Sequence, residues 1–158
     1  MENLLEYYLF YRLTLKFNHH MNLKDIPFAK LLGLANGQGE FLFELTDDIT
    51  YTNHLGTVAA AAQFSLAEFT SGQWLLNTFP DIAPNVIPML RKSEVKFKKP
   101  AYGKIRAKAI VSKETQDEFL HVITLHKRAL IKIYIVLVND NNEEVMNGVY
   151  EWFIQLKK

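Results

Sequence analysis

A single carboxylate stands in a long uncharged part of this 158-residue chain. Between Asp48 and Asp81 the sequence holds one charged side chain, Glu68, apart from the titratable His54. A glutamate is rarely buried without a partner, because removing its charge from water costs several kcal/mol. Glu68 is therefore either an interface or cavity-edge side chain satisfied by backbone donors or a lysine, or a general base or nucleophile whose pKa is raised by apolar surroundings.

The loop ahead of this carboxylate suits a developing negative charge. Gly56 and Thr57 supply a permissive turn and a cap at the expected start of a helix. Unpaired N–H groups and the helix dipole favour an anion there, so we expect the N–H groups of Gly56–Val58 to form an oxyanion hole. Glu68 lies about 16 Å further along at 1.5 Å per residue, so both groups cannot act on one carbonyl within one protomer.

The element that carries Glu68 is a predicted buried helix over 57–71. Its sequence, TVAAAAQFSLAEFTS, has helix-forming residues on every face, and a helix that is apolar all round is a buried one. Gly72 is the expected stop. A second helix lying antiparallel alongside would place one subunit's Glu68 near the other's Gly56–Val58.

Two kinds of hydrophobic period predict the other elements. A surface helix is expected near the N-terminus, where apolar residues recur at helical spacing. Alternation of apolar and polar residues predicts antiparallel strands elsewhere. The predicted elements are a helix over 1–20, a hairpin of 25–34 and 40–46 around the Asn36-Gly37 turn, an antiparallel pair of 93–98 and 105–111, a short helix or irregular stretch over 115–126, and a final hairpin of 130–138 and 145–156.

One long apolar helix and about six antiparallel strands admit few arrangements. A strongly curved sheet wrapped round the helix buries most of it and leaves one side for a partner. We therefore expect an α+β fold in a single domain over 1–158, with the core over 26–156 and an extra N-terminal helix. A second copy covering the open side predicts an isologous homodimer, with a dimer of dimers left open.

At this point the chain resembles a known family. Asn53-x-x-Gly56-Thr57, followed by a small-residue helix start and Leu66-x-Glu68, is similar to the hotdog-fold thioesterase signature Asn-x-x-Gly-x-x-His-Gly-Gly-x4-Leu-x-Asp/Glu. The similarity is closest to a PaaI-like branch with Gly-Thr at the helix start and Glu on the helix. Ala59-Ala60-Ala61 stand where many members have His-Gly-Gly, and Tyr51 where many have His.

The resemblance implies hydrolysis of acyl-CoA or acyl-carrier thioesters. In that interpretation Glu68 activates water or attacks the carbonyl, and Asn53 positions the carbonyl or the water. Gly56 belongs to the oxyanion hole, and substrate contacts are expected at Thr57, Val58, Ser65, Arg91, Lys92 and Lys99. The alternative is an acyl- or lipid-binding hotdog protein without turnover, which the loss of His-Gly-Gly favours and the retained Glu68 disfavours.

Charge along the chain is segregated although the net charge is only +1. Basic side chains concentrate between 88 and 108, where strand alternation puts several on one face. They could meet the phosphates of a CoA-like group, whereas a solvated strand face is the simpler account of any single one. RNA binding by this face is disfavoured, because Phe97 and Tyr102 are the only aromatics interleaved there.

The composition and the spacing of the histidines exclude several other kinds of site. The absence of cysteine excludes disulfides and thiolate chemistry, and the histidine pairs 19/20 and 121/126 lack metal-ligand spacing, so we expect no metal and no cofactor. Charges at Glu2, Glu6, Arg12 and Lys16 interrupt the apolar opening segment, which argues against a membrane anchor. A cytoplasmic location without a nucleic-acid or membrane partner is the expectation.

Overall fold

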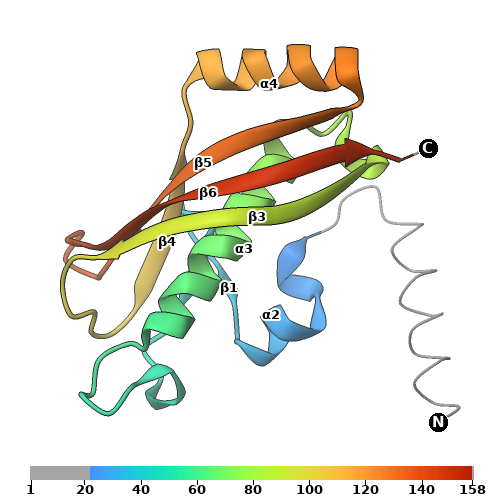
Figure 1. Ribbon diagram of the computed structural model, residues 1–158. Helices are drawn as coiled ribbons and strands as arrows, with labels where there is room; N and C mark the ends of the chain where they lie inside the picture. Colours follow the sequence, from blue (N-terminus) through green and yellow to red (C-terminus); the bar gives the residue numbers. More distant parts are fainter. Residues whose placement is uncertain (1–21, 158) are drawn as a thin grey trace, which may run out of the picture.

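The computed structural model describes residues 22–157, and the predicted N-terminal helix over 1–20 lies outside them. Six antiparallel strands form one curved sheet in the order β1-β2-β4-β5-β6-β3, wrapped round a long helix, α3 (Figure 1). This is the expected α+β arrangement. The strands are β1 Ala35–Asn36, β2 Phe43–Leu45, β3 Val86–Phe97, β4 Ile105–Ile110, β5 Arg128–Val138 and β6 Glu144–Leu156.

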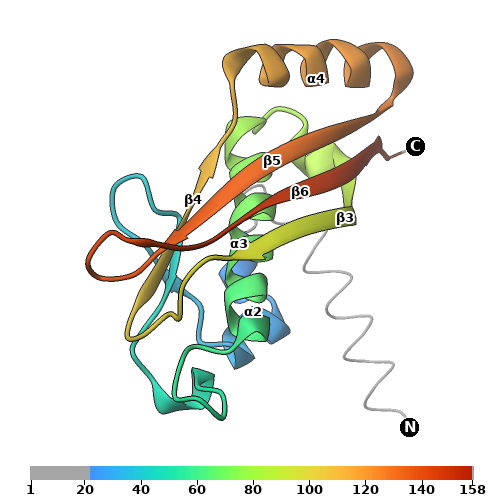
Figure 2. The same cartoon turned by 60° about the vertical axis from the view of Figure 1, so that its left-hand side comes forward.

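Helix α3 spans Ala60–Thr78 and packs against the concave face of the sheet, as the turned view in Figure 2 shows. It starts three residues later and ends seven later than predicted. Thr57 is not its cap, since Ala59 occupies that position without a side-chain hydrogen bond. Gly72 does not stop it either: a β-carbon there would meet Leu23 Cδ1 at 2.8 Å and the Trp152 ring at 3.3 Å, so this glycine allows close packing.

The predicted pairing of 93–98 with 105–111 is wrong. β3 pairs with β6 along its length, and β4 lies between β2 and β5. The connection between β3 and β4 passes the start of α3, where Val58 N–H donates to the Ala101 carbonyl at 2.8 Å. Alternation of apolar and polar residues predicts which face of a strand is buried, but it does not predict which strand lies beside it. The final hairpin of β5 and β6 is confirmed.

The segment 25–34 is helical rather than extended. A 3-10 turn, Leu23–Asp25, leads into the short helix α2, Pro27–Leu31, with Pro27 at its first position. Proline suits this position because the N–H it lacks has no helical partner there. The predicted hairpin survives only as the short β1–β2 pair.

Helix α4, Lys113–His126, lies across one end of the sheet (Figure 1). The Ser112 side chain caps it by accepting from Thr115 N–H at 3.2 Å. Phe119 and Ile123 are buried beneath it, and the Phe119 ring lies 4.8 Å from the Phe79 ring at the end of α3. The stretch predicted as a short helix or irregular is therefore a regular helix. Within the described residues, no helix combines the length and apolarity needed to cross a membrane.

Candidate active site

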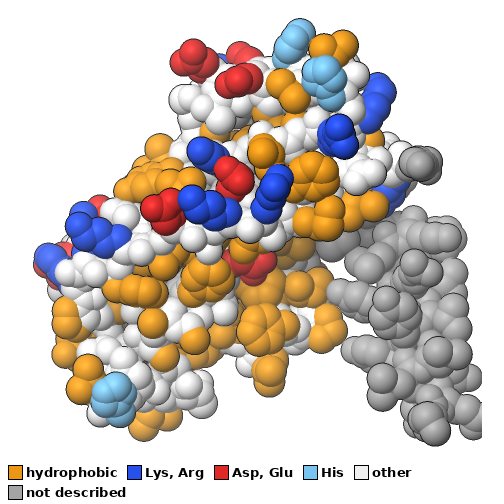
Figure 3. Space-filling model, viewed as in Figure 1, with side chains coloured by type: hydrophobic (Ala, Val, Ile, Leu, Met, Phe, Trp, Pro, Cys, Tyr) orange, Lys and Arg blue, Asp and Glu red, His pale blue; other side chains and the backbone are white. Residues whose placement is uncertain are grey.

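Glu68 lies in the third turn of α3 and is half-buried. Its carboxylate makes no hydrogen bond or ion pair with any described residue, so neither a lysine nor a backbone donor of residues 22–157 satisfies it. Burial raises the pKa of this carboxyl above its usual value. Figure 3 shows hydrophobic side chains gathered on the surface below β3, with an acidic side chain among them.

The turn of α3 that carries Glu68 is fastened to β6. Ser71 Oγ donates to the Glu68 carbonyl oxygen at 2.7 Å and accepts from Trp152 Nε1–H at 3.0 Å. One turn earlier, the Phe64 ring packs on the Tyr150 ring with centroids 5.6 Å apart. Tyr150 and Trp152 are two residues apart on one strand and so share its inner face. This packing holds the Glu68 backbone in place while its side chain stays free.

The loop that precedes α3 is built around Asn53. Its Oδ1 accepts from Leu55 N–H at 2.9 Å and Thr57 N–H at 3.2 Å, and its Nδ2 donates to Thr57 Oγ1 at 2.9 Å. Gly56 adopts a φ of 71°, a left-handed conformation that side chains disfavour. Asn53 and Gly56 therefore shape the loop.

The expected oxyanion donors are already used. Gly56 N–H donates to the Asn53 carbonyl at 3.0 Å, Thr57 N–H to Asn53 Oδ1, and Val58 N–H to the Ala101 carbonyl. The expectation that Gly56–Val58 hold an oxyanion is corrected accordingly. The N–H groups of the first turn of α3, on Ala60, Ala61 and Ala62, donate to no described residue.

These free donors and Glu68 are separated along one helix. Ala60 lies eight residues before Glu68, which is about 12 Å at 1.5 Å per residue. A hydrogen bond spans only about 3 Å. One chain therefore does not bring its own helix start and its own Glu68 to the same carbonyl group.

The predicted substrate-binding residues are scattered. Thr57 and Val58 are buried within the loop, and Ser65 Oγ donates to the Ala61 carbonyl at 2.9 Å. Lys92 pairs with Glu94 at 3.2 Å and Lys99 with Glu143 at 2.8 Å. Arg91 has no ion-pair partner among the described residues.

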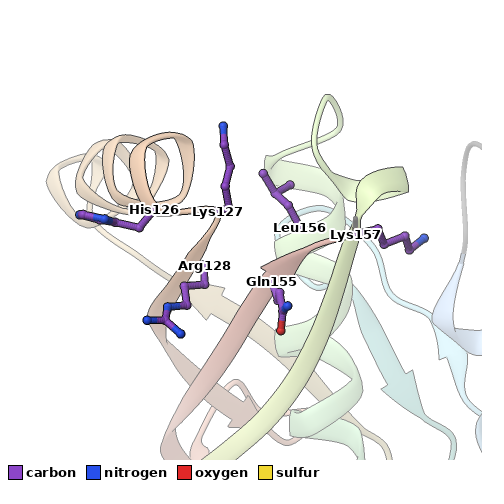
Figure 4. A pocket seen from close by; sticks show the side chains of 6 residues that line it. All are labelled: His126, Lys127, Arg128, Gln155, Leu156 and Lys157. Carbon is purple, nitrogen blue, oxygen red and sulfur yellow. The ribbon is translucent and has the colours of Figure 1, made fainter.

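A basic pocket that the sequence interpretation missed opens at the other end of the sheet, beside the end of α4 (Figure 4). The consecutive run His126-Lys127-Arg128 was the available signal. Lys127 Nζ donates to the Thr124 carbonyl at 2.9 Å, and Figure 4 shows the basic side chains diverging. Ligand sites need converging polar groups, so the pocket is not the chemical centre. Its lining residues are His126, Lys127, Arg128, Gln155, Leu156 and Lys157.

The curved antiparallel sheet round one long central helix is the hotdog fold, and it confirms the resemblance to the hotdog thioesterases at the level of the fold. The chain belongs to the DUF4442 family, a domain family of unknown function, which matches residues 34–154. No curated protein matches the chain.

Solved structures with the same fold are distant in sequence. A protein of unknown function from Pseudomonas aeruginosa, described as a "probable thioesterase", is 21% identical with a TM-score of 0.72, covering 85% of this chain and 91% of that one. A Bacillus halodurans protein solved with CoA is 18% identical with a TM-score of 0.62, covering 80% and 74%. The E. coli PaaI protein from the phenylacetic acid degradation operon is 13% identical with a TM-score of 0.53, covering 85% and 87%.

Proposed function

We propose that this protein is a thioester hydrolase for acyl-CoA or acyl-carrier substrates, with Glu68 as its general base or nucleophile. The observation that carries the proposal is the half-buried Glu68 carboxyl, which has no partner among the described residues and whose pKa burial raises. A base whose pKa approaches the working pH is the most effective one. The CoA present with the Bacillus halodurans neighbour supports a CoA-like ligand.

The reaction needs a polarised carbonyl and an activated water. Free N–H groups at the start of α3 donate hydrogen bonds to the developing oxyanion, aided by the helix dipole. Glu68 takes a proton from water while the water oxygen attacks the thioester carbon. The C–S bond then breaks, and the thiolate leaves with the proton that Glu68 returns. The products are a carboxylic acid and a free thiol.

Two chains are needed for one site, because Ala60 and Glu68 of one helix are about 12 Å apart. In a homodimer with antiparallel α3 helices, the helix start of one chain meets Glu68 of a second copy. β3 supports this arrangement, since it is a long strand at the sheet edge. Its large exposed hydrophobic side chains are Ile87, Met89 and Phe97.

The phosphates of a CoA-like group would contact Arg91, Lys92 and Lys99. Arg91 has no ion-pair partner in the described part of the chain, and the surface pairs of the two lysines are weak enough to exchange for phosphate. Asn53, Thr57 and Val58 contribute by holding the loop in shape. Ser65 lies one turn before Glu68 on α3 and lines the path of the thioester.

The decisive experiment measures release of free CoA from acyl-CoAs of graded chain length, with a thiol reagent. Glu68→Gln is expected to lower kcat by about 10²–10⁴-fold, the usual contribution of a general base. Glu118→Gln, on the exposed surface of α4, is the matched control. The hydrolase proposal would be wrong if no acyl-CoA of any chain length is hydrolysed, or if Glu68→Gln hydrolyses them as fast as wild type does. Tight acyl-CoA binding without turnover would favour the non-catalytic binding protein instead.

Mixed dimers test the shared site. Ala60→Pro removes one free N–H from the first position of α3, where proline is tolerated because Ala59 before it is extended. Ala60→Pro and Glu68→Gln chains are each expected to be inactive alone. Mixing them restores activity only if a site combines the helix start of one chain with Glu68 of the other. Failure of mixing to restore any activity would overturn the two-chain arrangement.

A further inference from the structure

Tyr150 carries a buried hydroxyl that the fold leaves unused. Its side chain is 0% exposed on β6, yet its hydroxyl has no hydrogen-bond partner among the described residues. Buried polar groups in folded proteins nearly always have a partner, because stranding one costs its desolvation. A phenylalanine would fill the same space without that cost. The hydroxyl therefore requires an explanation beyond packing.

The position of Tyr150 points to Glu68. Its ring packs on Phe64, and Phe64 and Glu68 are neighbours one turn apart on the same face of α3. The Ser71–Trp152 hydrogen bond fastens the following turn of α3 to the same strand. The Tyr150 ring therefore packs against the face of α3 that carries Glu68.

Electrostatics agree with this position. Burial first, and the Glu68 charge second, raise the pKa of Tyr150 well above its usual value. The hydroxyl therefore stays protonated and can donate throughout the pH range in which Glu68 ionises. Among the described residues, Glu68 is the one charged group that raises the pKa of Tyr150. Burial is what raises the pKa of Glu68 itself.

We propose that Tyr150 is a positioning residue for Glu68: its hydroxyl donates to the ionised Glu68 carboxylate and fixes the orientation of that base. The contact forms by a rotation of the Glu68 side chain, which is half-buried and free of other partners within residues 22–157. One carboxylate oxygen is then held by Tyr150 and the other faces the water. The catalytic meaning of this contact rests on the proposed hydrolase function.

The test is Tyr150→Phe, which deletes the hydroxyl and keeps the ring against Phe64. Tyr134→Phe, on the exposed outer face of β5, is the matched control. A donor to a carboxylate favours its ionised form, so its loss raises the pKa of Glu68. We expect kcat to fall by about tenfold or more, with the acid limb of the kcat/KM profile moving to higher pH. Above the pKa of Glu68, stability in urea should fall, because the hydrogen bond to the ionised carboxylate is lost; stability that stays equal or rises would show a stranded hydroxyl and contradict the contact.

A second measurement does not depend on turnover. In protein labelled with ¹³C-glutamate, the Glu68 carboxyl resonance, assigned by its loss in Glu68→Gln, is titrated in wild type and Tyr150→Phe. An upward shift of the Glu68 pKa in Tyr150→Phe alone supports the contact, and an unchanged Glu68 pKa overturns it. If wild type hydrolyses thioesters through Glu68 but Tyr150→Phe has unchanged kcat, only the positioning role fails. If wild type hydrolyses nothing, the proposed function fails while the titration still decides the contact.

Discussion

Replacing Ser71 by alanine tests how the turn that carries Glu68 is held. Ser71 is 0% exposed, and its hydroxyl accepts from Trp152 Nε1–H at 3.0 Å while donating to the Glu68 carbonyl at 2.7 Å. Ser71→Ala removes both bonds and strands the buried indole N–H of Trp152. The carbonyl of Glu68 loses only a second donor, since it also belongs to the backbone ladder of the helix.

The expected cost follows from these bonds. A net hydrogen bond contributes about 1 kcal/mol, and a stranded buried donor costs a further ~1–3 kcal/mol. Alanine recovers about 0.5 kcal/mol through its higher helix propensity. We therefore expect Ser71→Ala to lower the free energy of unfolding by about 2 kcal/mol.

Urea unfolding at fixed protein concentration measures the change, because association would make stability depend on concentration. Ser65→Ala is the control: its hydroxyl makes the same kind of bond to the helix backbone but has no partner on the sheet. We expect it to change stability by less than about 0.5 kcal/mol.

A double-mutant cycle isolates the Ser71–Trp152 contact. Trp152→Phe leaves no donor stranded, so the double variant should be more stable than the sum of the single changes allows, with a coupling energy of about 1–2 kcal/mol. A coupling near zero, or a loss from Ser71→Ala no larger than that from Ser65→Ala, would refute the reasoning.

Three further outcomes are expected. Because burial raises the pKa of folded Glu68, the folded state binds more protons than the unfolded state just above the ordinary glutamate pKa of about 4.3, and wild-type stability falls as pH rises through that window. Glu68→Gln should match wild type at lower pH and be more stable at neutral pH in urea titrations; a pH-independent difference would contradict this. Asn53→Ala, which deletes three loop hydrogen bonds, should cost about 1–2 kcal/mol in thermal unfolding. Gly56→Ala should cost about 1–2 kcal/mol through its positive φ alone, with Gly56→Asn recovering part; equal losses for both would argue against backbone strain.

Several features of the fold could be predicted from the local pattern of apolar and polar residues. Helix α3 was predicted as buried because its apolar residues surround it on all sides, and Glu68 stood out because that stretch has no other charge. The β5–β6 hairpin followed from β-branched alternation around an Asn-rich turn. These features depend on residues close together in the sequence, so the local pattern of apolar and polar residues is enough to predict them.

Strand pairing, the packing of α3 and the partners of its backbone N–H groups depended on residues far apart in the sequence. β6 rather than β4 lies beside β3, and Gly72 continues the helix because Trp152, eighty residues later, needs its space. Ala101 accepts the Val58 N–H, which moves the free donors into the first turn of α3. The packing of the Tyr150 ring on Phe64 of α3 likewise comes from strand register. A sequence specifies which faces are buried, whereas only the folded chain decides which groups meet across them and which polar atoms stay free for chemistry.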